Sequence, residues 1–171
     1  MMASRNNKRR VRKTLLIVGE GSSEKAFLGH LKSLYSTAAG PSISLISAGG
    51  KAPDGPIDEA ISYKKQREYD EIVVLLDTDI AWKKEKINEA EYNNIKLVGS
   101  EPCLEGLLLK ILDKSVSDES KKCKTQLQNM LPGKSTESRS YVPLFKKELL
   151  DKARNKVEPL NILIRYISGE K

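Results

Sequence analysis

Short, largely apolar runs alternate along the chain with longer segments in which apolar residues recur at helical spacing. Four of these runs predict strands, at residues 14–18, 43–47, 72–76 and 95–98. The runs at 14–18 and 72–76 show no polar alternation, so they are typical of strands buried on both faces, as in a parallel sheet covered by helices. The run at 72–76, Ile-Val-Val-Leu-Leu, is the clearest and predicts the central strand.

The segments of helical spacing lie between these strands and after the last one. Between the strands, helices are predicted at residues 23–36, 56–67 and 82–92. After the fourth strand, the segment that begins at Ser100 has the best apolar face, formed by Leu104, Leu107, Leu108, Ile111 and Leu112. Further on, we expect a weak helix around 118–131, an amphipathic helix from Tyr141 to Arg154 and a last helix from Pro159 to Ile167.

This alternation predicts an α/β protein with three layers around a mainly parallel, four-stranded, Rossmann-like sheet. If the strand order is 2-1-3-4, the first and third strands are neighbours and the topological switch point lies between them. We divide the chain into a basic N-terminal arm (1–13), an α/β core (14–112) and a helical C-terminal extension packed on the core (113–171).

Acidic residues stand directly after two of the predicted strands. Asp77 and Asp79 follow the central strand, and in an extended chain their i, i+2 spacing places them on the same side, about 6–7 Å apart at Cα. Glu20 follows the first strand. If these strands are neighbours, three carboxylates converge at the edge of the sheet where ligands bind. The alternative is that Asp77 begins a turn and Asp79 caps the next helix.

Carboxylates packed this closely repel one another, and the usual remedies are protonation of one group or a bound cation. Oxygen-only ligands suit Mg²⁺ or Mn²⁺, which retain waters and substrate phosphates as their other ligands. We therefore expect Mg²⁺, or Mn²⁺, at Glu20, Asp77 and Asp79, and metal-assisted phosphoryl-transfer chemistry.

The turn after the first strand has its own signals. Gly19 and Gly21 predict a sharp turn with positive φ angles. Ser22 or Ser23 is the expected N-cap of the next helix, with Glu24 in its first turn against the helix dipole.

Two other positions carry open alternatives. Glu101 and Glu105 are four residues apart, so on one helix they share a side at the margin of the apolar face. They are either surface residues or acids that point into a cleft. For His30, which lies just off the apolar stripe of its helix, we expect a structural or exposed role.

Positive charge is concentrated at the N-terminus. The formal net charge is +7, and residues 1–13 carry six basic side chains and no acid, which leaves about +1 for the rest. We expect the arm to contact nucleic acid or phosphate through residues that include Arg9, Arg10, Arg12 and Lys13. The alternative is a solvated terminus. Lys51, in a loop rich in glycine and proline, is a further candidate for an anionic ligand, unless that loop is a plain connection.

Composition excludes several classes of protein. Two cysteines and one histidine do not supply a Cys/His zinc site. No apolar run approaches the roughly 20 residues of a membrane span, so we expect no membrane contact and a cytoplasmic setting. Residues 133–136, Gly-Lys-Ser-Thr, do not form a P-loop, because Gln128 stands where that motif needs glycine and no apolar strand precedes it.

Five motifs in order carry a family resemblance: Val18-Gly-Glu-Gly-Ser-Ser-Glu24, the glycine-rich loop at 49–55, Tyr69-Asp-Glu71, Asp77-Thr-Asp79 and Glu101-Pro-Cys-Leu-Glu105. The chain thereby resembles the RloB-like family. Its two strands that end in Gly-Glu-Gly and Asp-Thr-Asp also resemble the Toprim domain, the catalytic module shared by topoisomerases, bacterial primases and several nucleases. The resemblance covers about residues 14–112.

The resemblance implies roles for four residues. Glu20 matches the Toprim glutamate, taken as general acid/base or metal ligand, and Asp77 and Asp79 match its metal-binding pair. Glu105 matches the acid of a Pro-x-aromatic-Glu motif in the RloB-like family. This chain departs from that motif, with Leu104 in place of the aromatic residue and Glu101 where a small polar residue is common. These departures put the substrate surface in doubt more than the carboxylates.

The leading hypothesis from the sequence is a Mg²⁺-dependent Toprim nuclease, or a nucleotidyl transferase, that acts on nucleic-acid phosphodiesters. The resemblance links it to restriction and phage-defence loci and so to a protein partner there. The alternative is a Toprim-like module that binds nucleic acid or a nucleotide without turnover. A haloacid-dehalogenase-type phosphatase is disfavoured, because here the Asp-x-Asp pair follows the third strand and a glutamate follows the first.

Overall fold

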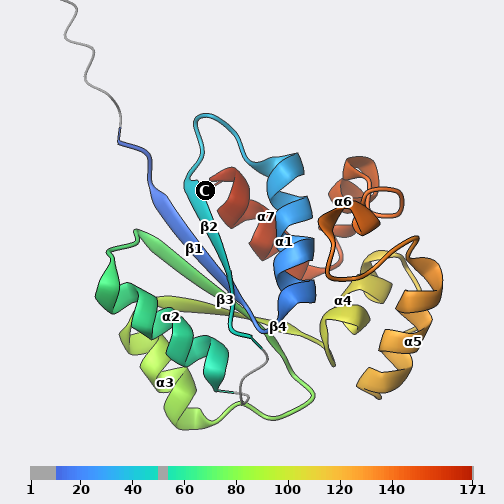
Figure 1. The fold of residues 1–171 in the computed structure, drawn as a ribbon, viewed down its shortest axis with the longest axis horizontal. Coiled ribbons are helices and arrows are strands. Elements are labelled where there is room, and N and C mark those ends of the chain that lie inside the picture. The colour runs from blue at the N-terminus through green and yellow to red at the C-terminus, as the bar shows by residue number, and fades with distance from the viewer. Residues whose placement is uncertain (1–10, 50–53, 171) are drawn as a thin grey trace, which may run out of the picture.

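A parallel four-stranded sheet forms the centre of the computed structural model, which describes residues 11–49 and 54–170 (Figure 1). Its strands are β1 (Thr14–Gly19), β2 (Ser42–Ser47), β3 (Glu71–Asp77) and β4 (Ile95–Ser100). All three strand pairings are parallel and the order is β2-β1-β3-β4. The predicted fold class and strand order are confirmed.

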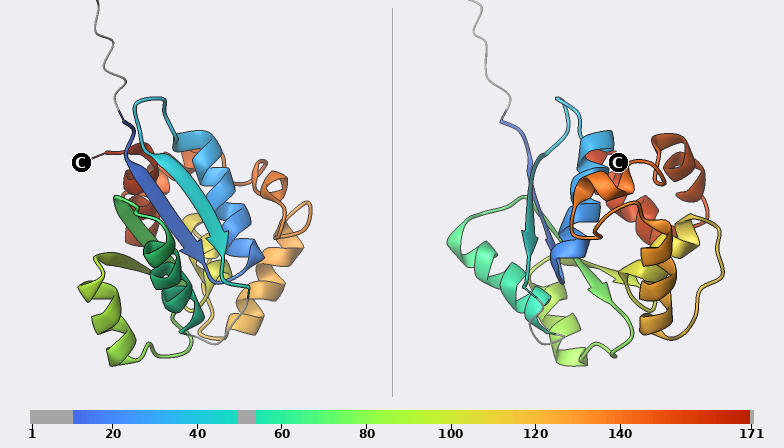
Figure 2. Two further views of the ribbon diagram at one scale, coloured as in Figure 1. Left: turned by 60° about the vertical axis from the view of Figure 1, so that its left-hand side comes forward. Right: turned by 45° about the vertical axis from the view of Figure 1, so that its right-hand side comes forward.

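Helices cover both faces of this sheet and extend beyond one of them. They are α1 (Ser22–Tyr35), α2 (Gly55–Gln66), α3 (Lys84–Tyr92), α4 (Leu104–Ile111), α5 (Ser120–Met130), α6 (Lys147–Ala153), α7 (Glu158–Ser168) and a short 3₁₀ helix, η1 (Ser138–Tyr141). Figure 2 shows α2 and α3 on one face and α1 and α7 on the other, with α4, α5 and α6 grouped beside α1. The result is three layers, with the C-terminal helices on the α1 side.

The continuous apolar runs follow from this double cover. Alternate residues of a strand point to opposite faces. One face carries Leu15, Ile17, Val73 and Leu75, which pack into the larger core with α1, α4, α5 and α7. The other face carries Leu16, Val18, Val74 and Leu76, which pack against α2 and α3. Because both faces are buried, neither set can be polar.

The predicted helix from Tyr141 to Arg154 is wrong in its first half. Residues 142–146 form turns, and α-helix resumes only at α6. The carbonyl oxygen of Phe145 accepts a hydrogen bond from the His30 side chain, where a continuous helix would use the backbone N–H four residues further on. The apolar side chains that suggested a helix are buried nonetheless, because the Tyr141 and Phe145 rings pack edge-on against Phe27 at centroid distances of 5.5 and 5.8 Å.

His30 has a structural role, as expected. Its side chain is buried in α1, and Nε2 donates a hydrogen bond of 2.6 Å to the carbonyl oxygen of Phe145. This contact joins the turn after η1 to α1. Over the described ranges 11–49 and 54–170, no helix combines the length and apolar character that a membrane crossing requires.

Candidate functional site

The site lies at the switch point of the sheet, where the connections that follow β1 and β3 lead to strands on opposite sides. From β1 the chain passes through α1 to β2 on one side, and from β3 it passes through α3 to β4 on the other. The carboxyl ends of β1 and β3 are therefore adjacent, with Gly19 paired to Leu75. Such switch points are the usual ligand sites of open α/β sheets.

Glu20 and Asp77 meet at this switch point. The backbone N–H of Asp77 donates a hydrogen bond of 3.1 Å to Oε2 of Glu20, across a separation of 57 residues. The two acids therefore lie side by side, as the strand order requires.

Asp77 is also held from the neighbouring connection. Its Oδ1 accepts a hydrogen bond of 3.1 Å from the backbone N–H of Leu104, at the start of α4. The Trp82 indole N–H donates to the carbonyl oxygen of Asp77 at 2.8 Å. The Leu104 N–H thus holds the carboxylate, while Glu20 and Trp82 hold the Asp77 backbone. The N-terminal end of a helix is a favourable place for the negative charge of Asp77.

Asp79 is exposed and bonds to the C-terminal helices. Its Oδ2 accepts a hydrogen bond of 2.8 Å from the hydroxyl of Ser120, the first residue of α5. Its backbone N–H donates to the carbonyl oxygen of Pro102 at 2.9 Å. Helix α3 begins with Lys83 as its N-cap, so the alternative in which Asp79 caps that helix is wrong.

A fourth carboxylate, that of Glu24, lies close enough to Glu20 for the two charges to interact. Its side chain is 8% exposed, and Oε2 accepts a hydrogen bond of 2.9 Å from the backbone N–H of Gly21. Burial raises the pKa of Glu24, two backbone hydrogen bonds oppose this, and the charges of Glu105 and Glu20 add to the rise. The sequence placed this residue only in the first turn of α1.

The turn itself corrects two expectations. The N-cap of α1 is Gly21, neither Ser22 nor Ser23, and it is capped by the Glu24 side chain. Gly21 has φ of −143°, and neither it nor Gly19 has positive φ. The reason for glycine at position 19 is close packing, because a Cβ there would lie 2.6 Å from Cβ of Glu24.

Glu105 and Glu101 are separated by the start of α4. Helix α4 begins at Leu104, so Glu105 lies in its first turn, while Glu101 lies before the helix and is exposed. The expectation that both share a helix face is wrong for Glu101. Glu105 is half-buried, and its charge contributes to raised pKa values at Asp77, Glu24 and Tyr141.

The electrostatic centre of this group is Asp77. Burial, followed by the charges of Glu20, Glu24, Asp79 and Glu105, raises the pKa of Asp77 to about 8. We call these five residues the carboxylate cluster. Concentrated negative charge in a partly buried place favours either a proton or a cation.

The donor set of the cluster suits Mg²⁺ or Mn²⁺, although the side chains are engaged in other bonds. Within residues 11–49 and 54–170, no three His, Cys, Asp or Glu side chains are arranged to hold a metal ion. In Glu20, Asp77 and Asp79, one carboxylate oxygen accepts a protein hydrogen bond, and the described residues provide no partner for the other. Each acid therefore retains one oxygen that a hard cation could take.

The basic residues predicted for this site lie elsewhere or outside the described residues. Arg12 and Lys13 precede β1, at the amino ends of the strands, about 20 Å from Glu20 by the length of a six-residue strand. The Arg12 guanidinium donates to the carbonyl oxygens of Gly40, Thr37 and Pro41. Lys51, Arg9 and Arg10 lie outside the described residues. The structure thus does not bring Arg12 and Lys13 to the carboxylates.

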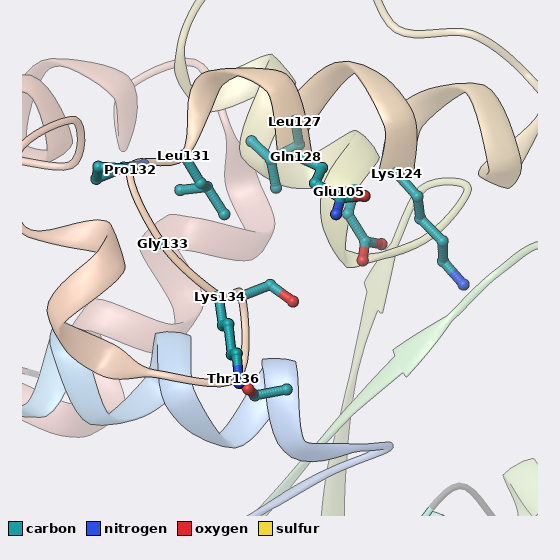
Figure 3. A pocket seen from close by; sticks show the side chains of 10 residues that line it. Glu105, Lys124, Leu127, Gln128, Leu131, Pro132, Gly133, Lys134 and Thr136 are labelled. Atoms are coloured by element: carbon teal, nitrogen blue, oxygen red, sulfur yellow. The ribbon is translucent and has the colours of Figure 1, made fainter.

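Other basic residues do lie beside the cluster, on the C-terminal extension. A cavity of about 650 Å³ opens between α5 and the loop at residues 131–136. Glu105 lines it together with Lys124 and Lys134, and Figure 3 shows the Glu105 carboxylate directed into the space between them. This loop includes the Gly-Lys-Ser-Thr segment at 133–136, which does not match a P-loop. No periodicity in the sequence predicts that it lies close to Glu105.

Gly106 allows the start of α4 to pack closely against Glu101 and Pro102. A Cβ at this position would lie 2.6 Å from Cδ of Pro102 and against the carbonyl oxygen of Glu101. The Pro102 carbonyl accepts the N–H groups of Thr78 and Asp79, so this segment cannot move without disturbing the acids. We expect Gly106→Ala to lower the free energy of unfolding by about 1–3 kcal/mol, measured by urea denaturation.

Lys110→Ala is the control for this change, because Lys110 is an exposed residue of the same helix. It should alter the stability by no more than about 0.5 kcal/mol. Equal stability of the two variants would show that the packing at Gly106 is not restrictive.

The all-parallel sheet and the helices on both of its faces place the protein in the class of open α/β folds, whose individual functions depend on the site and not on the fold. Within that class the chain can be placed further. A family model described as RloB-like protein matches residues 15–163, and the chain belongs to this family. The match continues through α5 and α6 into α7, well past the motifs at 18–105. Neither a curated protein nor a solved structure matches the chain.

Proposed function

We propose that this protein is a metal-dependent phosphodiesterase of the Toprim type that cleaves nucleic acid. The observation that supports this most is the hydrogen bond between Asp77 N–H and Glu20, which joins acids from two neighbouring strands at the switch point. Glu20, Asp77 and Asp79 would hold Mg²⁺ or Mn²⁺ through the oxygens that lack a protein partner. A divalent ion bound there stabilises negative charge on a phosphate and lowers the pKa of a bound water.

In the proposed hydrolysis, the oxygen of a water molecule forms a new bond to phosphorus, and the bond from phosphorus to the leaving sugar oxygen breaks. Glu20 is the group assigned to accept the proton of the attacking water, in which case Asp77 and Asp79 would hold the ion, and the leaving oxygen takes up a proton from solvent. Asp77, held by Leu104 N–H, stays fixed beside it. Glu105 is the fourth catalytic candidate, because its carboxylate faces the adjoining cavity.

The biological setting belongs to the same proposal. Membership of the RloB-like family supports a role in restriction or phage defence, together with a protein partner. Contacts to the nucleic-acid backbone, at a distance from the reacting phosphate, remain proposed for five basic residues: Arg9, Arg10, Arg12, Lys13 and Lys51.

The test is cleavage of labelled single- and double-stranded DNA and RNA, with Mg²⁺ or Mn²⁺ and with a chelator. We expect cleavage that requires the cation and is lost in the Glu20→Gln, Asp77→Asn double variant. The control is the Asp118→Asn, Glu119→Gln double variant, which makes the same chemical change at exposed positions and should cleave normally. Cleavage that survives in the site variant would rule the proposal out.

A second candidate is a binding module without turnover. It is favoured by the arrangement of the acids, since among the described residues no three are placed for an ion. Under this alternative, calorimetry should detect oligonucleotide or nucleotide binding to the wild-type protein. No substrate of the panel would then be cleaved under any of the metal conditions.

A further inference from the structure

The cavity beside the carboxylate cluster has the features of a substrate site. Its volume of about 650 Å³ lies in the range of small-ligand pockets. Part of its lining is apolar, from Leu127, Leu131 and Pro132, and part is polar, from Lys124, Gln128 and the segment 133–136. Glu105 belongs to both the cavity and the carboxylate cluster, so a molecule in the cavity lies next to the acids.

Two lysines give this cavity a net positive charge, because Glu105 is the single acidic residue among the described residues that line it. Lys124 and Lys134 are exposed, and neither has an acidic partner within 4.0 Å among the residues that the structure describes. Their neighbour Lys122, by contrast, is paired with Glu119 at 2.8 Å. The two unpaired ammonium groups are therefore available to an anion.

Side-chain hydrogen bonds hold the loop that carries Lys134 in place. The Ser135 hydroxyl lies 2.8 Å from the hydroxyl of Ser23 in α1. The Tyr141 hydroxyl donates to the carbonyl oxygen of Ser135 at 2.6 Å. Ser138, at the start of η1, donates to the carbonyl oxygen of Ala26 at 2.8 Å. Because the loop is anchored to α1, the helix that follows Glu20, little ordering is needed when a ligand binds.

We propose that this cavity holds the nucleotide next to the phosphodiester on which the carboxylates act. Lys124 and Lys134 contact its phosphate, and its base lies over Leu127, Leu131 and Pro132. A base can enter such a cavity only when it is unstacked, so the substrate is single-stranded or frayed at this point. This inference rests on the proposed function for the neighbouring phosphodiester, while the binding itself does not require turnover.

The test is the affinity for a labelled single-stranded oligonucleotide, measured by fluorescence anisotropy over a range of salt concentrations. Glu20→Gln is the background in which all the variants are compared, so that cleavage does not interfere. Adding Lys124→Gln and Lys134→Gln should weaken binding by about tenfold or more and reduce the slope of log K against log salt by about 1.4, or 0.7 for each phosphate contact. The matched control adds Lys121→Gln and Lys146→Gln, which remove the same charge from exposed positions outside the cavity and should change neither quantity.

Competition distinguishes the sources of the phosphate. A mononucleotide should displace the oligonucleotide from the Glu20→Gln protein, and inorganic phosphate should do so only at much higher concentration. A mononucleotide that competes as well as the oligonucleotide would identify a free nucleotide as the ligand and overturn the strand part of the proposal. Equal competition by inorganic phosphate would overturn the base contact.

The cavity and the catalytic proposal can fail separately. If the wild-type protein cleaves nucleic acid and the two cavity lysines affect neither KM nor affinity, the cavity proposal is overturned and the phosphodiesterase stands. If no substrate is cleaved but affinity depends on Lys124 and Lys134, the cavity proposal stands and the protein is a binding module.

Discussion

Asp77→Asn should reduce cation-dependent cleavage by about a hundredfold to a thousandfold while making the protein more stable at alkaline pH. The loss of activity follows from removing a charged oxygen from the group proposed to hold the ion. Asparagine keeps the shape of the side chain and an oxygen that can accept the Leu104 N–H, so the local fold is retained. The measurement of activity is the single-turnover rate of oligonucleotide cleavage.

The gain in stability follows from the burial of Asp77 and from the repulsion by the acids around it. The pKa of this carboxyl is raised from 3.8 to about 8, so between these values the folded state binds more protons than the unfolded state. The wild-type protein therefore loses stability as the pH rises through this window. Asp77→Asn removes this loss, and we expect it to exceed wild type by at least about 2 kcal/mol at about pH 8.5 and by much less at about pH 5.

Urea denaturation in the presence of a chelator provides this measurement. The control is Asp118→Asn, since this exposed acid is not one of those that raise the pKa of Asp77. A difference between Asp77→Asn and wild type that does not grow with pH would contradict the electrostatic account of the cluster.

A divalent cation should stabilise the folded protein, and more strongly at alkaline pH. At a free concentration of a hundred times its Kd, one bound ion adds about 2.7 kcal/mol to the free energy of unfolding. Binding competes with the proton on Asp77, so the stabilisation by Mg²⁺ or Mn²⁺ should increase as the pH is raised from about 6 to about 8.5. The measurement is the shift in Tm upon addition of MgCl₂ or MnCl₂ at constant ionic strength.

Two variants determine where the ion acts. Glu20→Gln and Asp77→Asn should each remove most of the shift, while Glu119→Gln, at the exposed N-cap residue of α5, should leave it intact. If Asp77→Asn shows the same shift as wild type, the ion binds elsewhere and the proposed ligand set is wrong.

The centre of the sheet could be predicted in detail from the sequence because β1 and β3 are buried on both faces. A strand such as β3 must be apolar throughout when helices cover both sides, and that requirement is visible without any contact information. The turns were less predictable. The region from Tyr141 to Phe145 has helical apolar spacing and yet forms turns, because this spacing reflects the packing of its two aromatic rings on Phe27 and not a helix.

The carboxylate cluster could be predicted only in part, for a related reason. Glu20 and Asp77 were found because each directly follows a recognisable strand, and the 2-1-3-4 order makes these strands neighbours. Glu24 was read as a residue of the first helical turn, and its burial depends on the packing of α1 against Gly19. Lys124 and Lys134 lie in the C-terminal extension, whose hydrophobic pattern is weak in this part. Exposed lysines are common there, and nothing in the sequence indicates which of them lie near the acids.

The sequence alone determined the α/β class, the four strands and the acids at the ends of two of them, since these depend on local burial and on adjacency along the chain. Only the tertiary structure decided that Asp79 bonds to Ser120, that Glu24 and Glu105 join the cluster, and that Lys124 and Lys134 line a cavity together with Glu105. Those relationships arise from the packing of α4, α5 and the following loop against α1. Packing between segments that are distant in sequence leaves no periodic pattern along the chain.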